Sequence, residues 1–225
     1  VFANVNRLIY VSKAELLGGN YFADALVPLI YTDIKIDALG VKDDQFGLGD
    51  PFVEPVGISW HGKRYDAAVG AGAYIPAGQY KDTEPASPGK DMWTGMFTAG
   101  GTVYFDEMKA IHLSMLNRYE VHSYKKELDI RPGDDFHFEW GLGGTINQVL
   151  DVGVAGYCQW QVTDDKGDDI PIEGNDRDRV FAAGPEISYF IPQHLFFVSL
   201  RGEWEFEAQD RSEGFITTLT LTKGF

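Results

Sequence analysis

The C-terminal stretch Gly214–Phe225 reads GFITTLTLTKGF. Counted back from Phe225, every second position is mostly apolar, and threonines fill most of the positions between them. A period of two is that of a β-strand, so one face of this strand is apolar and the other is lined by threonines. In a soluble sheet, a second layer would have to cover the apolar face.

Composition excludes several classes of protein. The 225 residues carry a formal net charge of -15, which repels phosphate backbones and argues against a nucleic-acid partner. The single cysteine, Cys158, rules out an internal disulfide framework and a cysteine-based zinc cluster. No apolar run reaches the roughly 20 residues of a membrane helix. We expect residues 1–225 to form a single domain.

Strand-like segments recur along the chain, each about ten residues long and followed by a turn, as in a meander or barrel. The parity is clearest in the later segments, where apolar and polar residues alternate. The eleven expected strands cover residues 1–12, 25–37, 52–60, 65–76, 93–105, 110–124, 136–146, 150–162, 180–191, 195–208 and 212–225.

The connections between these strands alternate in length. Short turns follow residues 60, 105, 146 and 191, and longer hydrophilic connections cover residues 37–50, 77–92, 125–135 and 164–179. Outer-membrane barrels place short turns in the periplasm and long loops outside, and they have even strand numbers. The sequence therefore predicts an all-β fold, a transmembrane antiparallel up-and-down β-barrel of about twelve strands in the bacterial outer membrane. Eleven strands are visible, so we expect one further strand ahead of Val1.

Charged residues on one face of the later strands indicate a wet interior. In residues 195–208, one face is apolar and the other carries Ser199, Arg201 and several glutamates. Burying such charges in a dry core without partners would be costly, whereas a wet lumen removes most of that cost. The residues expected to line the lumen are Arg118, Glu120, His122, His137, Glu139, Tyr157, Gln159, Glu186, Arg201, Glu203 and Glu205.

Short motifs resemble those of one outer-membrane family. They are NRLIY at 6–10, GGNY at 18–21, FGLGDP at 46–51, IPAGQY at 75–80 and the run 214–225. On these motifs the chain resembles, over essentially its whole length, the family labelled "putative meta-pathway of phenol degradation". The resemblance implies a twelve-stranded channel for uptake of small hydrophobic molecules, often linked to growth on aromatic compounds. Periodicity by itself indicates only a barrel.

Other functions stay open at this point: an outer-membrane barrel enzyme acting on lipids, a general small-solute porin, and a soluble β-barrel or sandwich that binds a ligand internally. A Ser–His hydrolase needs nucleophile and base within hydrogen-bond reach and an oxyanion site. No recognisable phospholipase or protease motif supports that geometry, so we expect no catalytic residues and no enzyme. No His-x-x-His or His-Glu-x-x-His spacing occurs, and we expect neither a metal site nor a cofactor.

The expected partners are outer-membrane lipid, lipopolysaccharide and small hydrophobic solutes, and we expect a monomer. Passive diffusion would deliver the solute through the periplasmic mouth or sideways between strands. Because proline lacks the N–H that a strand ladder needs, prolines mark candidate points for a lateral exit. These candidates are Pro28, Pro55 and Pro185.

Overall fold

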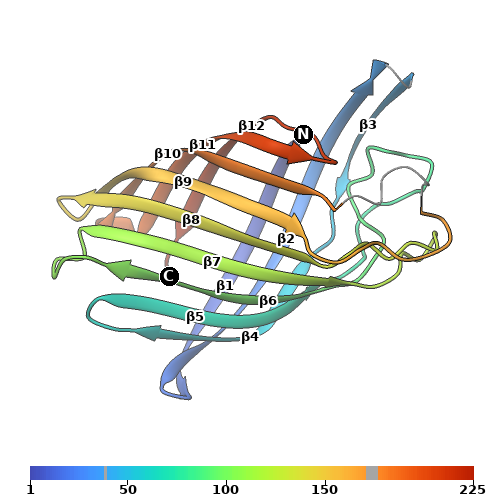
Figure 1. Cartoon of the computed structure of the whole chain (residues 1–225). Helices are drawn as coiled ribbons and strands as arrows, with labels where there is room; N and C mark the ends of the chain where they lie inside the picture. The colour runs from blue at the N-terminus through green and yellow to red at the C-terminus, as the bar shows by residue number, and fades with distance from the viewer. Residues whose placement is uncertain (38–39, 171–176) are drawn as a thin grey trace.

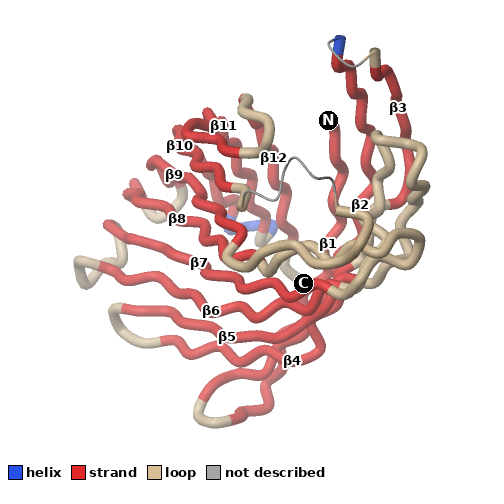
Figure 2. Tube along the Cα trace, turned by 45° about the vertical axis from the view of Figure 1, so that its right-hand side comes forward, coloured by secondary structure: helices blue, strands red, loops and turns tan. Residues whose placement is uncertain are grey.

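The structure is a computed structural model that describes residues 1–37, 40–170 and 177–225. These residues form one curled antiparallel sheet in the order β1-β2-β4-β5-β6-β7-β8-β9-β10-β11-β12, with β3 paired to β2 beside this path (Figures 1 and 2). The predicted all-β, up-and-down architecture is confirmed. The strands are β1 (Phe2–Leu16), β2 (Gly19–Ile36), β3 (Val41–Leu48), β4 (Phe52–His61), β5 (Tyr65–Tyr74), β6 (Thr94–Tyr104), β7 (Ile111–His122), β8 (Asp135–Ile146), β9 (Leu150–Gln161), β10 (Arg179–Ile191), β11 (Phe196–Gln209) and β12 (Phe215–Lys223).

Strand β2 is the longest, with 18 residues, and one of its edges serves two partners. Residues 20–26 pair with β4, and residues 29–36 pair with β3. The expectation that residues 37–50 form only a loop was therefore wrong. The sequence of β3 is too polar to show a strand pattern. The strand forms because β2 extends beyond β4, which leaves part of its edge free to pair with β3. The resulting hairpin projects past the rest of the sheet (Figure 1).

The two ends of the sheet differ, as the connection lengths predicted. Tight turns join β4 to β5, β6 to β7, β8 to β9 and β10 to β11 at one end, and the long connections gather at the other (Figure 1). Part of the predicted connection 164–179, namely residues 171–176, lies outside the described residues, as do residues 38–39 of the connection 37–50. The described residues contain no helix long and apolar enough to cross a membrane.

Strands β1 and β12 form the two edges of the sheet, which is therefore a half-barrel. Within residues 1–37, 40–170 and 177–225, no strand pairs with the outer edge of either. Unpaired backbone groups are strongly disfavoured in hydrocarbon, so a membrane sheet has to close. The eleven strands on the main path are an odd number. The further N-terminal strand, which would join the two edges, stays a prediction.

The convex face of the sheet is apolar and exposed. Leu142, Leu200 and Trp204 are 50%, 48% and 56% exposed although they lie in the middle of well-paired strands. The residues between them on the same strands are largely half-buried. A soluble protein rarely leaves so large a contiguous apolar face in water, whereas lipid is a suitable solvent for it.

Candidate functional site: the concave face of the sheet

Curvature brings together side chains from strands that are not neighbours. Arg201 of β11 places its Nη1 3.7 Å from Oε2 of Glu139 on β8, although β9 and β10 lie between these strands. Tyr157 of β9 likewise donates a hydrogen bond to Glu205 of β11, across β10. Such contacts require the side chains to converge, so the charged face is the concave one.

A glycine makes one of these long contacts possible. Glu54 of β4 accepts a hydrogen bond of 2.9 Å from the Thr98 hydroxyl of β6. Gly70 of β5 lies between them, and a Cβ at this position would approach the Glu54 Oε1 to 2.2 Å. The absent side chain leaves space on the concave face for the carboxylate to cross β5.

Five charged residues form a network in the middle of this face, which we call the central network: Arg118, Glu139, Glu186, Arg201 and Glu203. Arg118 donates to Glu139, and Arg201 Nη2 lies 3.0 Å from Glu186 Oε2. Arg201 Nη1 also lies 3.9 Å from Glu203 Oε1. Glu203 is only 4% exposed, and its Oε1 has no hydrogen bond to the described residues. Two guanidinium groups face three carboxyl groups, so the acids of the network outnumber its cations.

A cavity of about 430 Å³ lies between the central network and the short turns. Its lining residues come from all eight strands from β4 to β11. Two histidine–carboxylate pairs stand at the turn end: His61 Nδ1 is 2.9 Å from Asp66 Oδ1, and His112 Nδ1 is 3.7 Å from Asp151 Oδ2. This volume is in the range of pockets that hold small organic molecules.

A second polar group, which we call the outer group, lies at the other end of the face, where the long connections leave; it consists of Glu120, His122, Asp135 and His137. His137 Nε2 is 3.2 Å from Glu120 Oε1, and His122 Nε2 is 3.3 Å from Asp135 Oδ2. Glu120 and His122 are 8% and 4% exposed. The described part of the chain thus holds polar groups at both ends of the concave face as well as at its centre.

The predicted lumen residues fall into these groups. Five make up the central network, Tyr157 and Glu205 form their own pair, and Glu120, His122 and His137 belong to the outer group. Gln159 stands on β9 between His137 of β8 and Val180 of β10. Their role in transport stays a prediction.

Sequence reasoning missed Asp135, which completes the outer group. The signal was present as two acid-x-His pairs, Glu120-x-His122 and Asp135-x-His137. Alternate residues of a strand share a face, so this spacing places acid and imidazole together.

Comparison with known proteins identifies the family to which the chain belongs. The profile of the family described as "Putative MetA-pathway of phenol degradation" matches residues 1–221. The chain belongs to this family. Family and fold place it in the bacterial outer membrane, as predicted. A search of curated proteins found no match.

The fold is similar to a crystal structure of the COG4313 outer membrane channel from Pseudomonas putida F1. The TM-score is 0.80 at 12% sequence identity, over 97% of this chain and 81% of that chain. Identity this low supports a likeness of fold alone. It agrees with the predicted barrel-type architecture.

The Gly-Asp-Pro motif at residues 49–51, one of the motifs that resemble the family, has a structural role. Asp50 Oδ1 accepts the Gly78 N–H at 2.9 Å, and its Oδ2 accepts the Lys90 N–H at 2.8 Å. Gly78 packs so closely on Gly89 that a Cβ would lie 2.8 Å from the Gly89 Cα. The carboxylate therefore ties the link between β3 and β4 to the connection between β5 and β6.

The three prolines named as lateral-exit candidates occupy different settings. Pro28 lies where the partner of β2 changes from β4 to β3, and its carbonyl accepts the Gly49 N–H at 3.0 Å. Pro55 lies in a bulge, because the register of β4 shifts there against both β2 and β5. Pro185 faces Val154 within a continuous register between β9 and β10. The ladder is thus irregular at two of the three prolines.

Proposed function

We propose that the chain forms an outer-membrane channel for passive uptake of small hydrophobic or aromatic molecules. The observation that carries this proposal is the cavity on the concave face, which eight successive strands line together. A polar interior behind an apolar, lipid-facing exterior is the arrangement of channel-forming barrels.

Two observations favour a small hydrophobic or aromatic solute. The family description names phenol degradation, and the structurally similar protein is described as an outer membrane channel. In addition, small residues form much of the cavity wall, among them Ala68, Gly100 and Gly143. They leave room for a flat ring between the two polar ends of the cavity. For an apolar solute, lipopolysaccharide outside is the barrier, and a protein path avoids it without any energy source.

The surroundings and the exit route complete the proposal. We expect a monomer whose convex face contacts outer-membrane lipid and whose long connections meet lipopolysaccharide. The solute leaves through the periplasmic mouth, or sideways at the irregular ladders beside Pro28 and Pro55. Disulfide cross-links across these two sites would separate the routes, because they would stop only lateral release.

Uptake into proteoliposomes tests the proposal. Protein in vesicles should admit an aromatic compound faster than a sugar of similar size. Gly143→Trp should block entry, because a side chain there meets His112 and Asp151 in the cavity. Val152→Trp is the matched control, since Val152 is 46% exposed on the convex face of the adjoining strand. Equal entry of both solutes would replace the proposal with a general porin, and uptake insensitive to Gly143→Trp would remove the cavity from the path.

A barrel that hydrolyses lipid is the second candidate function. The Ser114 hydroxyl on the concave face lies 2.8 Å from the Thr102 hydroxyl. Among the described residues, no hydrogen bond joins a serine hydroxyl to a histidine ring, which a Ser–His nucleophile requires. We therefore expect no phospholipid hydrolysis by vesicles that show uptake, and hydrolysis abolished by Ser114→Ala would favour the enzyme.

A further inference from the structure

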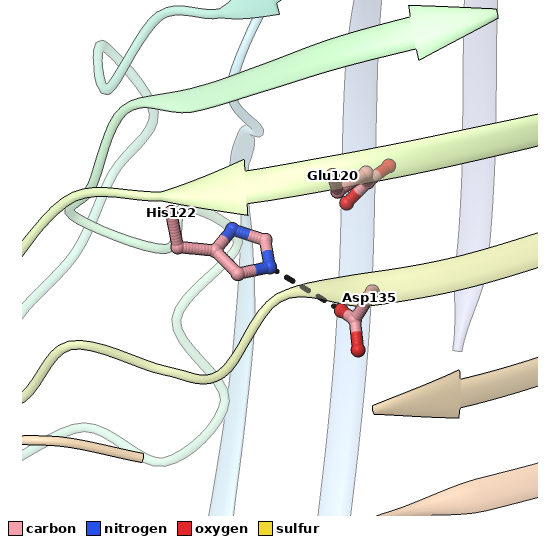
Figure 3. A group of neighbouring side chains, drawn as sticks. All are labelled: Glu120, His122 and Asp135. Atoms are coloured by element: carbon pink, nitrogen blue, oxygen red, sulfur yellow. Dashed lines mark hydrogen bonds and ion pairs between the residues drawn. The ribbon is translucent and has the colours of Figure 1, made fainter. Parts of the chain in front are cut away.

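The outer group of the concave face is built from two neighbouring strands. Glu120 of β7 stands directly opposite Asp135 of β8, and His122 and His137 follow two residues after each of them. Ligand atoms of Glu120, His122 and Asp135 all lie within 4.8 Å of one another. Figure 3 shows the His122 ring directed towards the Asp135 carboxylate, with Glu120 beside them. An oxygen of each of two carboxylates and an imidazole nitrogen therefore lie close enough together to share one ion.

Residues outside this triad hold its members in position. The Thr94 hydroxyl oxygen lies 2.8 Å from His122 Nδ1. When Nδ1–H donates to that oxygen, the lone pair of the ring is on Nε2, which faces Asp135. Glu120 is also positioned by a histidine: its Oε1 lies 3.2 Å from Nε2 of His137, within hydrogen-bond distance. Hydrogen bonds of this kind orient the ligands of natural metal centres.

We propose that Glu120, His122 and Asp135 bind one divalent transition-metal ion, with Zn²⁺ as the best fit. Imidazole and carboxylate are typical zinc ligands, whereas Ca²⁺ and Mg²⁺ prefer oxygen ligands alone. The 3.3 Å between His122 Nε2 and Asp135 Oδ2 is the ligand separation of a tetrahedron with bonds of about 2.0–2.1 Å. The two carboxylates balance the charge of the ion, and a fourth position is left for water.

The ion would fasten the outer end of the barrel wall. Arg131, in the connection between β7 and β8, donates from Nε to the His122 carbonyl at 2.9 Å, and its Nη2 lies 3.2 Å from Asp134 Oδ1. A metal held by His122 and Asp135 would therefore join both strands and the base of this connection. The site is independent of the solute proposed above, so either proposal can fail without the other.

Metal titration of the folded full chain tests the site. Chelator-treated protein in detergent should bind one Zn²⁺ by calorimetry, and bound Co²⁺ should give the intense visible absorption of a four-coordinate ion. His122→Asn and Glu120→Gln should each weaken binding at least about tenfold, and His137→Asn about tenfold while the Co²⁺ spectrum is kept. His112→Asn is the matched control, because His112 lies on β7 as His122 does and also pairs with a carboxylate, that of Asp151 on β9. Its Zn²⁺ affinity should equal that of the unaltered chain.

The proposal is overturned if the unaltered chain shows neither binding heat nor a Co²⁺ spectrum. It is also overturned if folded His122→Asn and Glu120→Gln bind as the unaltered chain does. Heat-modifiable gel mobility shows whether a variant is folded. For a variant that does not fold, the unaltered chain supplies the test: X-ray absorption at the zinc edge should show an imidazole nitrogen and carboxylate oxygens at about 2.0–2.1 Å from the bound ion. A zinc spectrum without an imidazole ligand refutes the site.

Discussion

Replacing Arg201 with methionine should destabilise the folded protein by about 2–3 kcal/mol. The substitution keeps much of the volume and removes the charge that faces Glu186 at 3.0 Å, Glu139 at 3.7 Å and Glu203 at 3.9 Å. Two unit charges about 4 Å apart attract by about 4 kcal/mol at an effective dielectric constant of about 20. Exposed pairs contribute only about 0–1 kcal/mol. The Arg201 side chain is 25% exposed, so an intermediate loss is expected.

Urea unfolding of the protein in lipid vesicles, followed by gel mobility, measures this loss. Arg179→Met is the control, because Arg179 and Glu207 form a pair at 3.9 Å whose side chains are 44% and 68% exposed. It should lose less than about 1 kcal/mol. Arg201→Met leaves the buried carboxylate of Glu203 without a neighbouring cation. In a double-mutant cycle, adding Glu203→Gln to Arg201→Met should therefore restore part of the lost free energy of unfolding. Equal unfolding midpoints for the two arginine variants would refute the reasoning.

Two further outcomes follow from local geometry. Gly184→Ala should lower the free energy of unfolding by about 1–3 kcal/mol, because the added Cβ would lie 1.8 Å from the Gly202 carbonyl oxygen. Gly141→Ala is the control: its Cβ would lie 3.9 Å from the nearest atom, so the free energy of unfolding should change by no more than about 0.5 kcal/mol. Equal unfolding midpoints for the two variants would contradict this prediction. Asp106→Ala should weaken the turn between β6 and β7, because backbone N–H groups, that of Ile111 foremost, lower the pKa of the Asp106 carboxyl. Because the pKa of Asp106 is lower in the folded than in the unfolded protein, the carboxylate stabilises the fold fully above the unfolded-state pKa of about 3.9, and this stabilisation is lost as the pH falls through the folded-state pKa. The unfolding curves of the unaltered protein and of Asp106→Ala should therefore differ at neutral pH and converge in acid.

Much of the fold was predictable because lipid imposes a simple pattern. Each strand from β4 onward begins and ends within a few residues of its predicted bounds, since the alternation and the turn residues are local signals. β3 was missed because its residues, VKDDQFGL, show no apolar face. Its pairing depends on the overhang of β2, which is a property of the sheet and not of the segment itself.

The faces of the strands were predictable, but the groupings on them were not. Parity assigned Arg201 and Glu139 to the same side of the sheet. Their 3.7 Å approach across two intervening strands depends on curvature, which a local pattern does not encode. The role of Asp50 was likewise hidden, because its partners Gly78 and Lys90 are 28 and 40 residues away. Asp135 and His122 come together only through the register of β7 and β8.

The central claim is that the convex face of the sheet touches lipid. A variant that keeps Trp204 and has phenylalanine at the other four tryptophan positions tests it by fluorescence. In vesicles, brominated lipid should quench Trp204 strongly, because this side chain is 56% exposed on the apolar face, and aqueous iodide should have little effect. Strong quenching by iodide with none by brominated lipid would show that this face meets water, and would contradict the membrane barrel and the channel together.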